Sequence, residues 1–425
     1  MKKQLLIIMM VTILLATMFA GRTTSANTTA TPSTASMQVT NEFRIGVLLP
    51  LSGDATETGR SAQAALAVAD DDINNYLATI NSSVRICLVS LDTRSDPATA
   101  LDDLKALHAQ AIQVVIGPFS SAEVNATWRY AYENNMILVS YGSTAPSLAI
   151  PNNNVFRFVP DDTHEVAALS QLMQEDGIKV VVPLWRDDTW GNDHVATLRT
   201  DVEKYGGTVA EGVRYAPGTT DFSSTLTALS PQVRQAVEQH GATAVAVQVI
   251  GLDEVRNVFA QASGDAQLAS VRWYGGSPTP LSLIATTPSA AQFAVKTGLI
   301  ASKLAEGQGD RFERVKAQVT EKLGHVPQPY SYAAYDSAWV ITIAYLETRS
   351  AGSSVMNVAI PFVADSYYGI TGNTALNAAG DRKFARYDFW SVMQENGTYN
   401  WKKVGGYSFD PETGKGVITR IGQRF

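Results

Sequence analysis

Two segments of the sequence end in small hydroxyl residues whose types and spacing suit the binding of a polar ligand. The first spans residues 114–121 (VVIGPFSS), and the second, one expected helix later, spans residues 137–146 (ILVSYGSTAP). Each begins with an apolar, β-branched run, which is typical of a buried parallel strand whose carboxyl end opens into a ligand crevice. Hydroxyl groups donate and accept hydrogen bonds, and backbone N–H groups at a helix start attract negative charge. Two such ends side by side therefore predict a pocket for a small polar or anionic ligand.

Common patterns of catalytic sites are missing from the sequence. It holds no G-x-S-x-G elbow, no G-x-G-x-x-G turn after the first expected strand, no phosphate loop ending in G-K-S/T and no H-E-x-x-H pair. The histidines lack the spacing of metal ligands, and we expect them on polar helix faces at the surface: His108, His164, His194, His240 and His325. The sequence thus predicts neither an enzyme nor a cofactor, and no metal site.

Length, composition and charge narrow the class of protein further. With 425 residues, 45% hydrophobic and 17% charged, the chain has enough apolar content for more than one core. Its formal net charge of -7 argues against nucleic acid as a partner, because the neutralisation of phosphates needs a basic face. The single cysteine, Cys87, excludes an intramolecular disulfide.

The first 42 residues predict export. Lys2 and Lys3 precede an uncharged apolar run over residues 5–20, so we interpret residues 1–26 as a signal peptide or, alternatively, a retained N-terminal anchor. Residues 27–42 are rich in Ser and Thr and poor in apolar side chains, which predicts a flexible stalk. The expected location is therefore periplasmic or at the cell surface, with tethering by the N-terminal segment if it is not cleaved.

Strands and helices are expected to alternate after the stalk, which indicates βαβ units and parallel sheets. A polar joint at residues 160–162 separates two such series and predicts two doubly wound α/β domains. The first series has expected strands 43–50, 84–92, 113–117 and 136–140 and helices 59–77, 97–110 and 122–134. The second has expected strands 179–185, 208–215, 244–250 and 271–275 and helices 192–205, 222–239 and 253–262. A long apolar helix over residues 330–348 and a hairpin pairing residues 387–394 with 401–409 follow.

The order and spacing of several short motifs resemble those of the periplasmic solute-binding proteins of the leucine/isoleucine/valine-binding type, the receptors of ABC importers. The resemblance covers residues 43–409, nearly the whole chain after the stalk. Its carriers are residues 45–53 (IGVLLPLSG), 69–74 (ADDDIN), 115–121, 139–146, 156–160 (FRFVP), 188–191 (DTWG), 332–336 (YAAYD), 370–372 (ITG) and 379–381 (AGD).

The resemblance implies a type I periplasmic-binding fold, with two doubly wound parallel-sheet lobes joined by a three-crossover hinge and a ligand cleft between them. Lobe one would comprise residues 43–159 plus 292–360, and lobe two residues 160–291 plus 361–425. Closure of the lobes would capture a small polar solute, namely an amino acid, an amide, a urea-like compound or a carboxylate. The implied partners are that solute and an ABC permease in the membrane, and a monomer is expected.

Candidate ligand-binding residues follow from the family positions. Ser121 matches the hydroxyl that grips a ligand carboxylate, the turn after the next strand supplies contacts, and an aromatic residue of lobe two closes over the ligand. The candidate residues are Ser121, Gly142, Ser143, Thr144 and Trp190. Helix capping by Ser121 and an ordinary turn at residues 143–144 are the alternatives.

The chain departs from the family where amino-acid binders hold the α-ammonium with a tyrosine and an acid. Gly251 and Ser277 occupy those positions and carry no charge. Since a buried ammonium without a carboxylate is costly, the ligand lacks an ordinary α-ammonium unless Asp188, Asp253 or Asp336 supplies the counter-charge. Two other functions stay open: a ligand-sensing ectodomain for a separate signalling partner, and an exported α/β hydrolytic enzyme.

Overall fold

The computed structural model of the protein describes residues 41–279 and 283–422. The expected signal peptide or anchor, residues 1–26, and nearly all of the expected stalk lie outside these residues. The last two stalk positions, Asn41 and Glu42, instead begin strand β1 (Asn41–Leu49), because they pair in register with Val84 and Arg85 of the next strand. Within the described residues, no helix combines the length and the apolar character needed to cross a bilayer.

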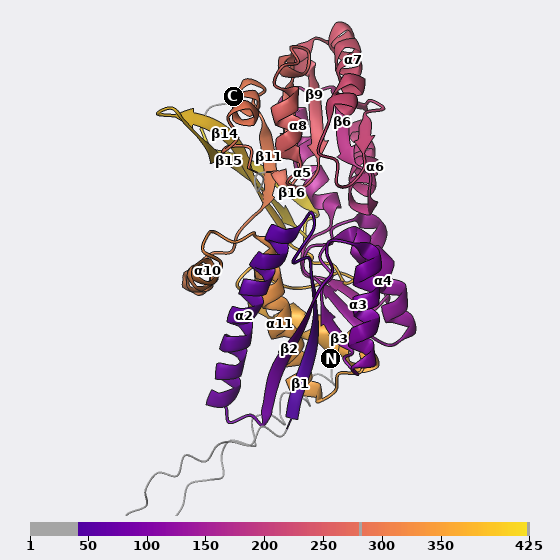
Figure 1. Cartoon of the computed structure of the whole chain (residues 1–425), viewed down its shortest axis with the longest axis vertical. Coiled ribbons are helices and arrows are strands. Elements are labelled where there is room, and N and C mark those ends of the chain that lie inside the picture. The colour runs from indigo at the N-terminus through magenta and orange to yellow at the C-terminus, as the bar shows by residue number, and fades with distance from the viewer. Residues whose placement is uncertain (1–40, 280–282, 423–425) are drawn as a thin grey trace, which may run out of the picture. The chain divides into compact units, whose positions relative to one another are not determined.

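The first sheet has five parallel strands in the order β2-β1-β3-β4-β5. Alternate residues of each strand face opposite sides, so that Val47 lies in the core shared with helices α2 and α11, and Leu48 lies in the core shared with α3 and α4. The bounds are β2 (Val84–Asp92), β3 (Val114–Ile116), β4 (Ile137–Ser140), β5 (Val155–Arg157), α2 (Thr56–Thr79), α3 (Pro97–Ala109), α4 (Ser121–Glu133) and the 3-10 turn η1 (Pro146–Leu148). Figure 1 shows β1, β2 and α2 in indigo.

The second sheet has nine strands, in the order β16-β15-β14-β11-β10-β9-β6-β7 with β8 beside β6. Its strands are β6 (Val180–Arg186), β7 (Thr208–Val209), β8 (Val213–Tyr215), β9 (Val245–Ile250), β10 (Arg272–Gly275), β11 (Ile300–Leu304), β14 (Ala385–Glu395), β15 (Thr398–Asp410) and β16 (Lys415–Arg420). Strands β6 to β11 are parallel, whereas β14, β15 and β16 are antiparallel, so the sheet is mixed rather than purely parallel. The yellow ribbon in Figure 1 is this antiparallel extension.

Helices cover both faces of the second sheet. Helices α7, α8 and α9 share one core with it, and α5 and α6 share the other. The bounds are α5 (Asp162–Glu175), α6 (Thr189–Lys204), α7 (Ser223–His240), α8 (Val255–Ala262), α9 (Pro288–Lys296), η2 (Ala242–Ala244) and η3 (Leu268–Ser270). The expected strand 208–215 is split into β7 and β8 because Gly212, with a φ of 76°, turns the chain where a Cβ would meet the Pro183 carbonyl oxygen at 2.3 Å.

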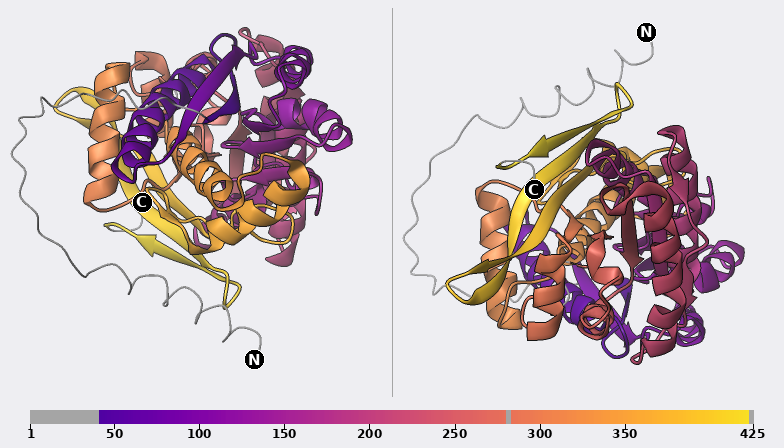
Figure 2. Two further views of the ribbon diagram at one scale, coloured as in Figure 1. Left: turned by 90° about the horizontal axis from the view of Figure 1, so that it is seen from below. Right: turned by 90° about the horizontal axis from the view of Figure 1, so that it is seen from above.

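The remaining helices return to the first sheet. Helices α10 (Asp310–Leu323), α11 (Tyr330–Thr348) and α12 (Ser353–Ser366) bury side chains in the same hydrophobic core as α2. The small hairpin of β12 (Tyr368–Gly369) and β13 (Gly372–Asn373) follows them. Helices α10 and α11 pack against α2, and Figure 2 shows orange helices beside the indigo α2. The described chain thus passes between the sheets three times: between β5 and α5, between β11 and α10, and between β13 and β14.

The two-lobe α/β fold was predicted correctly, but the lobe boundaries need two corrections. Residues 292–304 were expected in lobe one; they belong to the second sheet, because β11 pairs with β10 and β14. Residues 361–373 were expected in lobe two; they belong with the first sheet, because Val363, Ala364 and Ile370 are buried in the core that contains Tyr335.

Candidate functional site

A cavity of about 200 Å³ lies between the carboxyl ends of strands from both sheets. Among the expected ligand residues, Ser121, Gly142 and Thr144 line it from the first sheet and Trp190 lines it from α6 of the second. Phe119 and Tyr330 add aromatic walls, with their ring centroids 5.8 Å apart. The structure therefore brings both hydroxyl-ended segments of the sequence to one cavity and faces them with an aromatic side chain.

The hydroxyl of Ser121 is engaged by the protein itself. Its Oγ lies 3.0 Å from Ser143 Oγ and accepts hydrogen bonds from the backbone N–H groups of Thr144 and Ala145, each at 3.2 Å. The alternative that Ser121 caps helix α4 is wrong, because Ser120 is the N-cap and accepts from the Glu123 N–H at 3.2 Å. Ser121 thus shapes the turn after β4 while it lines the cavity.

Glycine at position 142 makes room for an aromatic wall. A Cβ there would lie 2.2 Å from Cδ2 of Phe119, closer than side-chain atoms approach one another. The same turn also joins the two lobes, because the Thr144 carbonyl oxygen accepts from the Asp162 N–H at 2.9 Å. The strand end that was expected to contact ligand is therefore next to the first crossing between the sheets.

Three of the expected ligand residues lie outside the cavity lining: Ser143, Gly251 and Ser277. Ser143 is fully buried against Ser121. At Gly251, the Tyr215 hydroxyl occupies the space of a side chain, since a Cβ there would lie 2.1 Å from it. Ser277 is 1% exposed, and its Oγ accepts from the Leu304 N–H at 3.0 Å, which joins the loop after β10 to β11.

The structure separates the three candidate counter-charges. Asp188 lines the cavity and caps α6, where it accepts from the Gly191 N–H at 2.9 Å. Asp253 is exposed to solvent and does not line the cavity. Asp336 is fully buried in α11 and accepts from the N–H groups of Ile370 and Thr371, both at 2.9 Å; burial raises its pKa. Of the three, only Asp188 lines the cavity.

Arg186 is the main residue of the cavity that sequence reasoning missed. Its guanidinium contacts Asp188 at 2.7 Å, Glu254 at 3.3 Å and, across the lobes, Asp54 at 2.9 Å. Arg186 and Asp54 both line the cavity. The sequence does contain a sign of it, because an arginine at the end of the buried strand VVVPLWR must find partners where that strand opens.

Glu123 adds a buried carboxyl group to the lining. It is 0% exposed, and its Oε2 accepts from the N–H and the hydroxyl of Ser120, both at 2.8 Å. Burial raises the pKa of this carboxyl group above its ordinary value. The cavity thus combines hydroxyl groups, aromatic faces, one guanidinium and several carboxyl groups, which suits recognition of a small solute that has both polar and apolar parts.

One histidine expected at the surface is buried beside this cavity. His194 of α6 is 0% exposed, and its ring lies edge-on to that of Trp190, with centroids 6.2 Å apart. Helix α5 brings Asp162 and Glu165 to it, and burial, followed by the charge of Asp162, raises the pKa of Glu165 to about 7. Residue types alone could not show that two helices bring these side chains together.

Comparisons with known proteins agree with this architecture. Residues 61–395 match the family described as the receptor family ligand binding region. The uncharacterized protein MJ1266 of Methanocaldococcus jannaschii is 27% identical over 414 residues, which cover 93% of this chain and 95% of that protein. The chemotactic signal transduction system substrate-binding protein BasB of Halobacterium salinarum is 27% identical over 397 residues, with 88% of each chain covered.

Solved structures show the same fold. The leucine-binding protein LivK of Thermotoga maritima superposes with a TM-score of 0.66 at 20% identity, covering 84% of this chain and 97% of that one. An ABC-transporter solute-binding protein of R. palustris in complex with 4-hydroxybenzoate gives 0.69 at 15% identity, covering 86% and 97%.

Proposed function

Since the chain belongs to the protein family described as the receptor family ligand binding region, we propose that it is an extracytoplasmic receptor that delivers a solute to an ABC importer. The observation that carries the proposal is the cavity between the two sheets, to which Ser121, Thr144, Arg186 and Trp190 come from opposite lobes. The chain crosses between the lobes three times, and the Arg186–Asp54 ion pair adds a contact between them. Ligand contacts with both lobes would favour a closed arrangement that a permease can recognise.

The proposed solute is a small polar molecule: an amino acid, an amide, a urea-like compound or a carboxylate. The aromatic walls Phe119, Trp190 and Tyr330 would hold its apolar part, and the hydroxyl-lined turn at Thr144 its polar part. Asp188 supports an amino acid, because it offers an ammonium partner that Gly251 and Ser277 do not. Arg186 supports an amine-free carboxylate, because it can form a bidentate pair.

Calorimetric titration of matched compounds tests the proposal. We expect saturable binding of one compound per chain from a panel that pairs leucine with 4-methylpentanoate and with 4-methylpentanamide. Trp190→Leu should weaken that binding, whereas Trp128→Leu, at a partly buried tryptophan of α4 that does not line the cavity, should leave it unchanged. Asp188→Asn should weaken only a ligand that carries an ammonium. Equal effects of the two tryptophan variants would place the site elsewhere.

A second function has support from one relative. BasB is described as part of a chemotactic signal transduction system, so a ligand-sensing role with a separate signalling partner is the alternative. Solute uptake and chemotaxis measured in a deletion strain distinguish the two. Loss of uptake with normal chemotaxis supports the importer, and the reverse result supports the sensor.

A further inference from the structure

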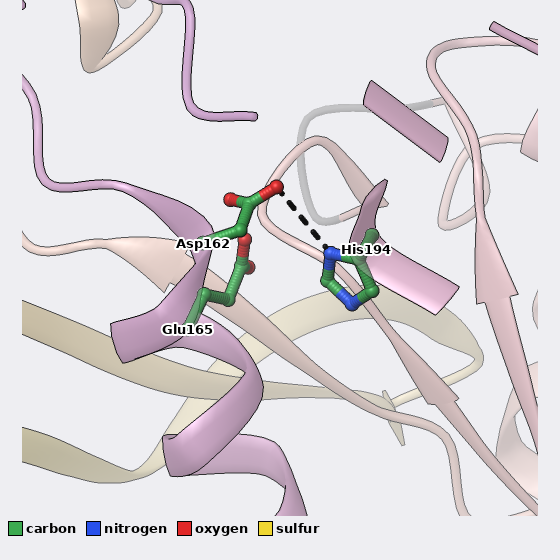
Figure 3. Close-up of side chains that lie close together, drawn as sticks. All are labelled: Asp162, Glu165 and His194. Carbon is green, nitrogen blue, oxygen red and sulfur yellow. Dashed lines mark ion pairs between the residues drawn. The ribbon is translucent and has the colours of Figure 1, made fainter. Parts of the chain in front are cut away.

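Asp162, Glu165 and His194 form a buried cluster behind the cavity wall. Asp162 is the first residue of α5, Glu165 lies one turn later on the same face, and His194 belongs to the neighbouring α6. Their exposed fractions are 1%, 2% and 0%, and one donor atom from each lies within 4.8 Å of the others. Figure 3 shows the two carboxyl groups and the imidazole converging from the two helices.

Two of the converging atoms have no hydrogen-bond partner among the described residues: Asp162 Oδ2 and His194 Nδ1. They lie 3.5 Å apart, as the dashed line in Figure 3 marks. Buried polar atoms are almost always hydrogen-bonded or bound to an ion or water. The two atoms form an ion pair when His194 is protonated, and when Nδ1 is unprotonated both offer lone pairs to a group between them.

One of the two amide orientations of Gln248 gives His194 a metal-binding tautomer. Gln248 places its amide 3.0 Å from His194 Nε2, and its Oε1 has no hydrogen-bond partner among the described residues. With the amide turned round, Oε1 accepts from a protonated Nε2 and leaves a lone pair on Nδ1 facing the carboxyl groups. On the other side, Glu165 accepts from the hydroxyl of Ser302, which orients that carboxylate.

The charged groups of the cluster also suit a bound cation. In the part of the chain that the structure describes, the ion pairs include no lysine or arginine on Asp162 or Glu165. The cluster borders the apolar core that contains Val166, Leu169 and Leu198. Two carboxyl groups and an imidazole become two anionic ligands and one neutral ligand when a divalent cation displaces their protons, and the cation then balances the two negative charges.

We propose that Asp162, Glu165 and His194 bind a zinc ion. A tetrahedral zinc with ligand bonds of about 2.0–2.2 Å separates its donor atoms by roughly 3.4 Å, close to the 3.5 Å between Asp162 Oδ2 and His194 Nδ1. Glu165 offers a carboxylate oxygen within 4.8 Å of both atoms, and water would complete the shell. The ion would join α5 to α6, the helix that carries Asp188 and Trp190 into the cavity.

Zinc binding to the EDTA-treated protein tests the proposal without any solute. We expect uptake of one equivalent of zinc in calorimetry and a rise in the unfolding temperature that saturates at that ratio. His194→Gln and Glu165→Gln should abolish both effects, whereas His240→Gln, at an exposed position on α7, should retain them.

Cobalt provides a measurement on the unaltered protein, in case the buried variants fail to fold. Bound cobalt should give a visible d–d absorption band that zinc removes by competition, with manganese as a weaker competitor. No stoichiometric uptake by the wild type, or equal uptake by folded His194→Gln, would overturn the proposal. Failure of solute binding would not affect this outcome, because the zinc titration contains no solute.

Discussion

Replacing Arg157 with methionine should destabilise the protein by about 3–5 kcal/mol, because it leaves the Asp381 carboxylate buried without a partner. Both side chains are 1% exposed, and they form a bidentate pair with Nε–Oδ1 and Nη2–Oδ2 distances of 2.5 and 2.6 Å. Arg157 also donates to the Ala145 carbonyl oxygen at 2.7 Å. The pair joins the end of β5 to the third crossing between the lobes, so its loss affects the connection of the two sheets.

Urea unfolding followed by tryptophan fluorescence measures this cost. The double variant Arg157→Met/Asp381→Leu should recover most of the stability, because replacing a buried ion pair with apolar groups of similar volume is often neutral. Arg234→Met, at an exposed position on α7, is the matched control and should change the free energy of unfolding by less than about 0.5 kcal/mol. Two results would refute the reasoning: a loss of unfolding free energy below about 1 kcal/mol in Arg157→Met, or a loss in the double variant equal to the sum of the losses in the two single variants.

Three further substitutions test the cavity wall. Ser121→Ala should cost about 1–3 kcal/mol of unfolding free energy in urea, because two backbone N–H groups lose their acceptor, and an unchanged value would contradict the network. Glu123→Gln should flatten the pH dependence of stability. Burial raises the pKa of Glu123 in the folded state, so the wild type loses stability as pH rises from about 4.3 through that pKa, whereas the glutamine variant does not. Thermal unfolding across pH checks this difference. Gly142→Ala should displace Phe119, costing about 1–3 kcal/mol and weakening solute binding in calorimetry, while Gly264→Ala, which meets nothing within 4 Å, should do neither.

The fold was largely predictable where secondary structure alternates with short connections. The expected helix 330–348 coincides with α11, and the expected strand 84–92 coincides with β2. Residues 276–329 show no comparable alternation, so the sequence does not predict α9, β11 and α10, and the predicted lobe boundary is misplaced. Strand β11 contains the polar residues Ser302 and Lys303 and is recognisable only by its pairing with β10 and β14.

The candidate site was predictable in part, and the reason lies in distance along the chain. Ser121 and Thr144 could be placed together because they follow neighbouring parallel strands. The Arg186–Asp54 contact joins the end of strand β6 to a turn of the other lobe that is far away in sequence, and no periodicity encodes it. The same holds for His194, whose burial depends on how α5 packs against α6 rather than on its own helix pattern.

The charges around Arg186 bear on which class of solute the cavity would accept. The guanidinium faces Asp54, Asp188 and Glu254, so three carboxylates surround one cation, and the local charge is negative when all are ionised. A solute carboxylate must therefore displace an existing ion pair to reach Arg186, whereas an ammonium adds to an already acidic surface. The lack of charge at Gly251 and Ser277 disfavours an α-ammonium only at those positions. We therefore expect Asp188 to govern selectivity in the proposed site, since it is the one expected counter-charge in the cavity lining and already pairs with Arg186.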